Sequence, residues 1–326
     1  MPYLSETDYR SPFYLFNGHL QTIIPSLMRR VQGITYIRER LTTPDDDFLD
    51  LDWSYVGSGA PVRKLAIISH GLEGDSKRPY VTGMARVLNA AGYDVLAWNY
   101  RSCSGEINQQ RRFYHIGATD DMHTVVQYVL QNHDYERIYM LGFSAGGNIT
   151  LKYLGEQGQA VSSRIQKAVV FSVPLDVATS SMKIAQPQNF IYEQRFLRSL
   201  RKKVLLKAQL MPGAIDTEPL RFIRKLKEFD QHYTAPLHGF RDADDYYMRN
   251  SSKLFLSGIS VPALIVNARN DPFLSPECFD QSLVKNLPQV WLQVTQAGGH
   301  CGFMYQSLQN AYWSENRALA FLATEV

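Results

Sequence analysis

The sequence is poor in cysteine and lacks the cysteine spacings of a disulfide framework or a zinc site. Its 326 residues include only three cysteines, Cys103, Cys278 and Cys301, and no C-x-x-C pair occurs. Widely spaced cysteines in odd number do not suggest a disulfide scaffold, and structural zinc sites usually use paired ligands at short spacing. We therefore expect neither a structural disulfide nor a metal, and we interpret Cys103 and Cys301 as small packing residues.

A strong net charge of either sign is also missing. Lys and Arg number 34 against 31 Asp and Glu, so the formal charge is +3. This excess is too small to argue for a nucleic-acid partner. Hydrophobic residues make up 45% and charged residues 20% of the chain, as in ordinary globular proteins. The chain has no internal repeat and no low-complexity tract, and it is long enough to bury a large core.

No stretch has the pattern of a signal peptide or a membrane span. The opening residues, MPYLSETDYRSPFYLF, lack a basic segment followed by an apolar run. Residues 11–28 contain no Asp, Glu, Lys or Arg, but Pro12, Gly18 and Pro25 interrupt them. A membrane-spanning helix needs about 20 predominantly apolar residues. We therefore expect a cytoplasmic protein without a transmembrane segment.

The sequence does contain a serine in a glycine-rich turn between an apolar strand and a helix. Residues 137–148 read RIYMLGFSAGGN, with a predicted strand at 138–141 and a helix predicted to begin near Ala145. The G-x-S-x-G pattern around Ser144, in this strand–turn–helix setting, is typical of a nucleophile elbow. The backbone N–H of Ala145 would then face a developing oxyanion. For this pattern alone, a glycine-rich turn without catalytic role is the alternative.

Apolar runs alternate with segments of helical periodicity through most of the chain. One of these helices is expected at 119–132, with either Thr119 or Asp120 as its N-terminal cap. The continuous apolar run at 65–69 indicates a strand buried on both faces. The alternation predicts an α/β fold, with a mainly parallel sheet and helices on both faces. The further expected strands are 34–41, 49–55, 65–69, 93–98, 168–173, 263–267 and 290–295, and the further expected helices are 17–28, 80–91, 119–132, 276–286 and 311–323.

The alternation stops at residues 174–258, where strand-like runs are missing and prolines interrupt a helical, basic and aromatic segment. We predict that this segment is a helical lid inserted into a core made of residues 1–173 and 259–326. Its basic run at 195–207 favours a solvated helix face over contact with an anionic lipid surface. The apolar residues expected to contact substrate, in the lid and beside the serine, are Phe143, Phe190, Phe196, Leu200, Leu210 and Met211.

A histidine and an acid suited to activating Ser144 follow later predicted strands. Asp271 comes after the strand at 263–267, and His300 comes after the last strand. Open α/β sheets keep their sites at the carboxyl ends of strands, and the chain order Ser, Asp, His is that of α/β-hydrolase triads. Histidine is a suitable base near pH 7, and the aspartate would hold its tautomer. Asp176 is the alternative acid.

The segment HGLEG at residues 70–74 leaves the predicted strand at 65–69. The backbone N–H of Leu72 is the expected second donor of an oxyanion hole, beside that of Ala145, and the glycine before it permits a close approach. We assign His70 a role in orienting this loop, because His300 has the better strand placement for a base.

These motifs resemble those of the YheT-like family of α/β hydrolases, which includes bacterial esterases, yeast medium-chain ethyl ester synthase/esterases, and animal acylglycerol and phospholipid lipases. One departure is Ser102, where relatives usually have glycine in the pattern NxRGCSG, and it leaves the triad untouched. The resemblance covers most of the chain and is carried by NGHLQT (17–22), HGLEG (70–74), RFYH (112–115), GFSAGGN (142–148), YTAP (233–236), NDP (270–272) and GGH (298–300).

The resemblance implies a serine carboxylesterase that hydrolyses short-to-medium-chain esters through an acyl-enzyme, without a cofactor. The expected partner is a small-molecule or lipid ester, and peripheral membrane contact is compatible with the basic lid. Three alternatives stay open: acyl transfer to an alcohol, an acylglycerol or phospholipid lipase on the same triad, and a catalytically silent ligand-binding protein on the same fold.

Overall fold

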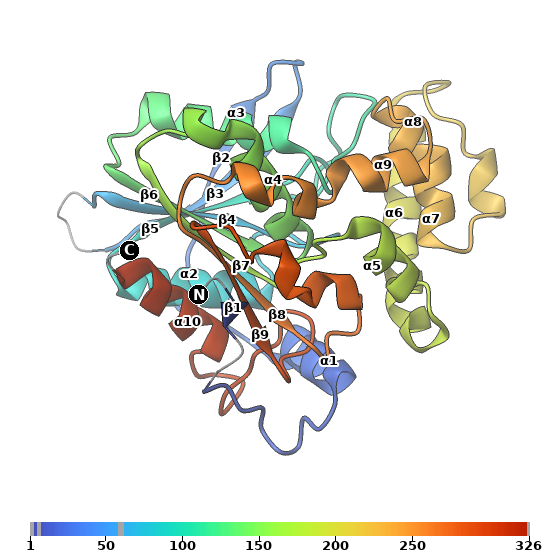
Figure 1. Ribbon diagram of the computed structural model, residues 1–326. Helices are drawn as coiled ribbons and strands as arrows, with labels where there is room; N and C mark the ends of the chain where they lie inside the picture. The colour runs from blue at the N-terminus through green and yellow to red at the C-terminus, as the bar shows by residue number, and fades with distance from the viewer. Residues whose placement is uncertain (1–2, 5–7, 58–61, 325–326) are drawn as a thin grey trace.

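The computed structural model describes residues 3–4, 8–57 and 62–324. In these residues the chain forms a nine-stranded sheet with the spatial order β1-β9-β8-β7-β6-β4-β5-β3-β2, which Figure 1 shows as a twisted central layer. The strands are β1 (Tyr3–Leu4), β2 (Ile37–Thr42), β3 (Phe48–Ser54), β4 (Lys64–Ser69), β5 (Asp94–Asn99), β6 (Arg137–Phe143), β7 (Ile165–Phe171), β8 (Ala263–Ala268) and β9 (Val290–Thr295).

Most of the sheet is parallel. Only the β2–β3 and β3–β5 pairs run antiparallel among the described strands, and the other neighbours are parallel. The central strands are buried almost along their full length, because helices cover both faces and leave no solvated side. The predicted mainly parallel α/β sheet is confirmed, and it brings the carboxyl ends of β4, β6, β7, β8 and β9 to one edge.

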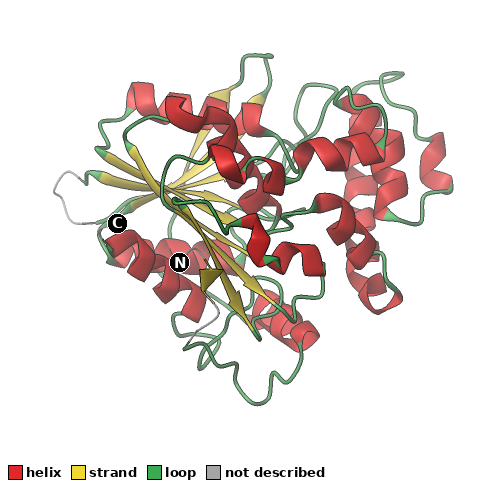
Figure 2. Cartoon of the chain, in the orientation of Figure 1, coloured by secondary structure: helices red, strands yellow, loops and turns green. Residues whose placement is uncertain are grey.

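Helices from different parts of the chain cover the two faces, as Figure 2 shows. On one face, α3 (Thr119–Asn132) and α4 (Ala145–Gln157) pack their apolar side chains on the sheet. On the other face, α2 (Pro79–Ala90) and α10 (Trp313–Ala323) do the same. A further helix, α1 (Gly18–Met28), begins at the N-cap Asn17, whose side chain accepts a hydrogen bond from the Leu20 N–H.

The chain between β7 and β8 contains no strand. It runs through helices that gather beside the sheet in Figure 1 and share an apolar cluster of their own. No helix of the described residues is both long and apolar enough to cross a lipid bilayer. The α-helices of this segment are α5 (Val177–Ile184), α6 (Phe190–Leu210), α7 (Leu226–Phe229), α8 (Ala235–Leu237) and α9 (Ala243–Asn250).

Two local predictions are wrong. The expected helix at 276–286 consists of two short 3₁₀ turns, Pro276–Phe279 and Gln281–Leu283. Between them Asp280 is extended, and its side chain accepts a hydrogen bond from the Ser282 N–H, so local side-chain bonding competes with a continuous helix. The helix at 119–132 starts after Ala118 without a side-chain cap. Thr119 and Asp120 lie inside its first turn, where acidic residues favour the helix dipole.

Candidate active site

Ser144 lies in a strained turn between β6 and α4. Its backbone has φ 55° and ψ −121°, a region that residues with a Cβ rarely adopt and that is tolerated mainly at functional sites. The flanking glycines are required by close backbone approach: a Cβ on Gly142 would lie 2.6 Å from Gly146 O, and one on Gly146 would lie 2.3 Å from Ser69 O. The sequence therefore forms a sharp turn that presents the serine at the carboxyl edge of the sheet.

His300 and Asp271 lie in loops that follow adjacent strands, β9 and β8. His300 Nδ1 is 2.8 Å from Asp271 Oδ2, and the other carboxylate oxygen accepts a hydrogen bond from the Phe273 N–H at 2.8 Å. The Asp271 side chain is fully buried and that of His300 is 12% exposed. Burial lowers the pKa of His300, but the Asp271 carboxylate and, after it, Cys301 raise this pKa, and the net shift is upward to about 10.

The two expected oxyanion donors face the cavity that Ser144 and His300 also line. This cavity includes Leu72 and Ala145, and neither backbone N–H has a hydrogen-bond partner in the described residues. The loop at 70–74 lies directly against the serine, because a Cβ on Gly71 would be 3.1 Å from the Ser144 Cβ. An N–H without a partner beside a nucleophile is available to a developing oxyanion.

His70 and Asp176 have structural partners of their own. His70 Nδ1 is 2.8 Å from Gly71 O, and its Nε2 accepts a hydrogen bond from the Tyr100 N–H. Burial lowers the pKa of His70 to about 3, so its imidazole is neutral. Asp176 caps α5 and forms an ion pair with Lys253 at 2.5 Å. The histidine after β9 is thus bonded to Asp271, and the alternative acid is engaged elsewhere.

Sequence reasoning gave no role to α1, yet this helix joins the two loops that carry Asp271 and His300. The buried Gln21 Oε1 accepts hydrogen bonds from Asn270 Nδ2 at 2.9 Å and from the Gly298 N–H at 2.7 Å. The Thr22 hydroxyl accepts one from the His300 N–H at 2.8 Å. The adjacent polar residues Gln21 and Thr22 were the signal for this role, and among the sequence arguments only the family resemblance, through the segment at 17–22, included them.

Two cavities meet at Ser144. A cavity of about 270 Å³ lies between α1, the 71–74 loop and the start of α6, and we call it the open cavity because exposed side chains such as Leu27 and Ile191 line it. A second cavity of about 110 Å³ lies beneath α5, α6 and α9, and we call it the closed cavity because only buried and half-buried residues line it. A substrate bound at the serine would therefore extend in two directions. The residues lining both cavities are Leu72, Ser144, Phe196, Phe273 and His300.

Of the six residues expected to contact substrate, two line a cavity at Ser144 and four lie elsewhere in the structure. Phe196 and Leu200 line the closed cavity. Phe143 points to the opposite face of β6, where its ring stacks on Phe171. The other three lie at or next to the two ends of α6, which is 21 residues long and extends beyond both cavities. They are Phe190 and Leu210, which are 58% and 66% exposed, and Met211.

The basic run of α6 is not simply a solvated face. Lys203 Nζ forms an ion pair with Glu73 at 2.8 Å and also contacts Cys103 Sγ at 3.2 Å. Lys207 is fully buried and donates hydrogen bonds to three oxygens of the loop before α3, those of Asn108, Gln110 and Arg112. These contacts fasten the helix to the core. Our interpretation of a solvated face fails for these two lysines, which the spacing of charges could not distinguish from their exposed neighbours.

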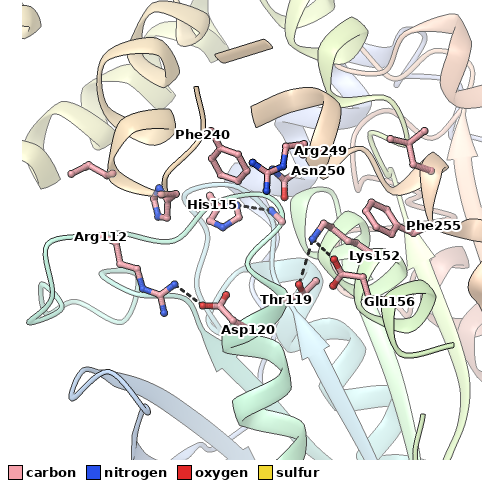
Figure 3. A pocket seen from close by; sticks show the side chains of 14 residues that line it. Arg112, His115, Thr119, Asp120, Lys152, Glu156, Phe240, Arg249, Asn250 and Phe255 are labelled. Atoms are coloured by element: carbon pink, nitrogen blue, oxygen red, sulfur yellow. Dashed lines mark hydrogen bonds and ion pairs between the residues drawn. The ribbon is translucent and has the colours of Figure 1, made fainter. Parts of the chain in front are cut away.

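A larger cavity of about 680 Å³, which Ser144 does not line, lies beside the start of α3 and the end of α9. Figure 3 shows its charged side chains pointing toward one another, with Arg112 paired to Asp120 and Lys152 paired to Glu156, each at 2.5 Å. None of the predicted site residues lines it. Its cations are compensated within the protein, which distinguishes it from the open cavity at Ser144.

Comparison with known proteins gives consistent results along the chain. A family model described as the alpha/beta hydrolase fold matches residues 66–307. The YheT protein of Escherichia coli K12, named as an esterase, is 33% identical over 312 residues, which cover 94% of this chain and 91% of that protein. The phospholipase ABHD3 of Mus musculus is 28% identical over 309 residues, which cover 93% of this chain and 74% of the relative.

Among solved structures, an esterase of Pyrobaculum calidifontis superposes with a TM-score of 0.57 and covers 93% of this chain and 87% of its own. Its sequence is 17% identical, so this likeness concerns the fold alone. It is independent of the motifs, since the superposition follows the arrangement of strands and helices.

Proposed function

The chain belongs to the YheT-like family of α/β hydrolases and is a carboxylic ester hydrolase, and we propose that it cleaves short-to-medium-chain esters through an acyl-enzyme on Ser144. The observation that carries the proposal is the 2.8 Å hydrogen bond between His300 and Asp271, at the cavity that the strained Ser144 also lines. A serine hydroxyl is a weak nucleophile until a base removes its proton, and the base must be oriented.

In the first half of the proposed reaction, Ser144 Oγ attacks the ester carbonyl while His300 Nε2 takes the hydroxyl proton. Asp271 holds Nδ1–H and stabilises the imidazolium. The carbonyl oxygen becomes an oxyanion that accepts hydrogen bonds from the N–H groups of Leu72 and Ala145. Each donor of this kind is worth about 3 kcal/mol in the transition state. The tetrahedral intermediate then collapses, and the alcohol leaves with the proton from His300.

In the second half, water replaces the alcohol. His300 takes a proton from the water as its oxygen attacks the acyl carbon, and the same two N–H groups hold the oxyanion. Collapse releases the carboxylic acid and returns the proton to Ser144. Acyl transfer would use the same acyl-enzyme with an alcohol as second nucleophile, so the partition between acid and ethyl ester in added ethanol distinguishes the two activities.

The closed cavity supports the proposed acyl size. We place the acyl chain there because no exposed side chain lines this cavity, its volume is about 110 Å³, and Phe196 and Leu200 belong to its lining. Each methylene buried in such a site contributes about 0.8 kcal/mol. The ratio kcat/KM should therefore rise with acyl length and stop rising where the cavity is full. In this proposal residues 174–258 act as a lid, since α5, α6 and α9 form its walls.

A lipase is the second candidate, and a specific observation favours it. The rim of the open cavity carries apolar side chains facing solvent, among them Leu27 and Ile191, which are 53% and 76% exposed. The mouse relative ABHD3 is named a phospholipase. A lipase would act faster on micellar than on monomeric substrate at equal total concentration, whereas a carboxylesterase would show no increase at the critical micelle concentration.

The proposed function is tested by active-site labelling. A fluorophosphonate probe should label the wild-type protein on Ser144, and Ser144→Ala should abolish both labelling and hydrolysis of p-nitrophenyl butyrate. Ser26→Ala is the matched control, because Ser26 lines the open cavity on α1 but has no part in the proposed reaction. A folded wild-type protein that neither labels nor hydrolyses any ester would contradict the proposal and favour a ligand-binding protein.

A further inference from the structure

Two arginines at the open cavity lack a carboxylate partner. Arg78, in the loop before α2, and Arg195, on α6, both line this cavity. Arg78 donates a hydrogen bond to the Glu73 carbonyl oxygen at 2.7 Å, whereas Arg195 has no hydrogen bond or ion pair with any residue that the structure describes. The cavity therefore contains two guanidinium groups that form no ion pair with a carboxylate in the part of the chain that the structure describes.

The other charges of this cavity are compensated. The buried Arg29 is paired with Glu315 at 2.5 Å, and the Glu73 carboxylate is paired with Lys203 at 2.8 Å. Apart from these two ion pairs, the charged side chains that line the cavity are Arg78 and Arg195, together with His300 when it is protonated. The cavity in Figure 3 shows the contrasting arrangement, in which Arg112 and Lys152 each have a carboxylate partner.

The two uncompensated arginines affect each other. Burial and the charge of Arg78 both lower the pKa of Arg195, although a guanidinium stays charged at neutral pH. Like charges beside a partly enclosed cavity are unfavourable in the free protein, and an anion placed between them relieves the repulsion. Arginine is suited to this task because its planar group donates two parallel hydrogen bonds to a carboxylate or a phosphate.

The position of the arginines determines which part of an ester they would meet. If the acyl chain occupies the closed cavity, the alcohol portion occupies the open one. This orientation also suits the reaction, because the alcohol must leave and water must enter before the acyl-enzyme is hydrolysed. Arg78 and Arg195 thus lie on the leaving-group side of Ser144.

Resting on the proposed function, we infer that the preferred ester carries an anionic group, a phosphate or a carboxylate, on its alcohol portion, and that Arg78 and Arg195 bind this group. The contact is made away from the reacting carbonyl, so it strengthens substrate and transition-state binding alike. Interactions of this kind lower KM more than they raise kcat. The preference should also weaken as ionic strength rises, because salt screens exposed charges.

The inference is tested with butyryl esters that share an acyl chain and differ in the charge of the alcohol. The neutral reference is 1-butyrylglycerol, the anionic esters are 1-butyrylglycerol 3-phosphate and O-butyrylglycolate, and the cationic ester is butyrylcholine. We expect kcat/KM for an anionic ester to exceed that of the neutral one about tenfold, and the cationic ester to be poorest. The better of the two anionic esters identifies phosphate or carboxylate as the preferred group.

The variant Arg195→Gln assigns the preference to the arginine. It should bring the ratio of anionic to neutral kcat/KM close to one, mainly through a higher KM for the anionic ester. Arg198→Gln is the matched control, because Arg198 lies one turn further along α6 and borders a separate surface hollow. It should keep the wild-type ratio. Raising the ionic strength should lower the ratio of the wild-type protein but not that of Arg195→Gln.

The possible failures are distinguishable. An anionic-to-neutral ratio near one in the wild-type protein, with Ser144 still labelled by fluorophosphonate, would overturn this inference and leave the proposed function intact. Equal losses on all four esters in Arg195→Gln would indicate a structural role and would also overturn it. Absence of both labelling and hydrolysis would overturn the proposed function, and this inference with it.

Discussion

The contact between Asp271 and His300 has a direct consequence for pH dependence. The carboxylate favours the imidazolium and raises the pKa of His300 above its ordinary value of about 6.5. Only neutral His300 can accept the Ser144 proton, so activity is lost as pH falls through the raised pKa. We predict that kcat/KM for p-nitrophenyl butyrate still rises with pH above about 7. A profile that stays flat into the acidic range would exclude histidine as the base.

The variant Asp271→Asn tests the contribution of the carboxylate to the pair of Asp271 and His300. Loss of the carboxylate should move the ascending limb of the pH profile to lower pH and reduce kcat on the order of 10³-fold or more. The matched control is Asp176→Asn, which removes the ion pair with Lys253 but not the hydrogen bond between Asp271 and His300. If Asp176→Asn shifts the limb and Asp271→Asn does not, the assignment of the acid is wrong.

The serine, aspartate and histidine could be predicted from the order of residues along the chain. A serine nucleophile requires a base and an acid, and an open α/β sheet presents such residues directly after its strands. The same reasoning could not assign Phe190 and Leu210, which are exposed. Apolar spacing indicates which face of a helix is buried, but not where along that helix a cavity ends. It also could not detect that Lys207 is buried, because a lysine among other basic residues is usually solvated.

At the scale of elements, α1 positions the histidine loop. The Thr22 hydroxyl accepts the hydrogen bond from the His300 N–H at 2.8 Å, and a positioning contact of this kind affects catalysis through alignment. We predict that Thr22→Val lowers kcat about 10- to 100-fold with a smaller change in KM. Thr22→Ser keeps the hydroxyl and should retain most activity. Equal activity of the two variants would show that α1 only packs against the loop.

The second element with a testable role is α6, which Lys207 fastens to the loop before α3. Replacing this lysine by methionine keeps the apolar stem but removes three hydrogen bonds from a charged donor, and among the described residues only the neutral donors Ser102 and Asn108 still bond to these oxygens. We predict a loss of about 2–4 kcal/mol in the free energy of unfolding, measured by urea denaturation. Lys202→Met is the matched control, since Lys202 is exposed and should have little effect. A Lys207→Met protein as stable as the control would mean that this anchor does not contribute.

Elements with long, strongly patterned sequences were predictable, and short ones were not. All eight expected strands correspond to β2–β9. Continuous apolar runs indicate the strands buried on both faces, and alternating residues indicate the exposed edge strand β2. The two-residue β1 has too little pattern to be recognised. The expected helix at 276–286 failed because Asp280 bonds its local backbone, which a periodicity of apolar residues does not reveal.

At the scale of the whole molecule, the fold places Ser144, Asp271 and His300, from three separate segments, at one edge of a sheet. The segment at 174–258 adds the closed cavity on one side, and α1 adds the open cavity on the other. The strand pattern indicated this edge, whereas the two cavities depend on how α1 and α6 pack on the core. Tertiary packing of this kind has no signature in a single sequence.

The proposed reaction is tested most directly by trapping its intermediate. The protein is mixed with p-nitrophenyl butyrate, quenched in acid within the first turnover, and examined by intact-mass measurement and peptide mapping. The proposal predicts one butyryl group on Ser144, formed as fast as the burst of p-nitrophenol and absent from Ser144→Ala. Turnover without an adduct on Ser144, or a butyryl group on the neighbouring Cys301 in its place, would contradict it.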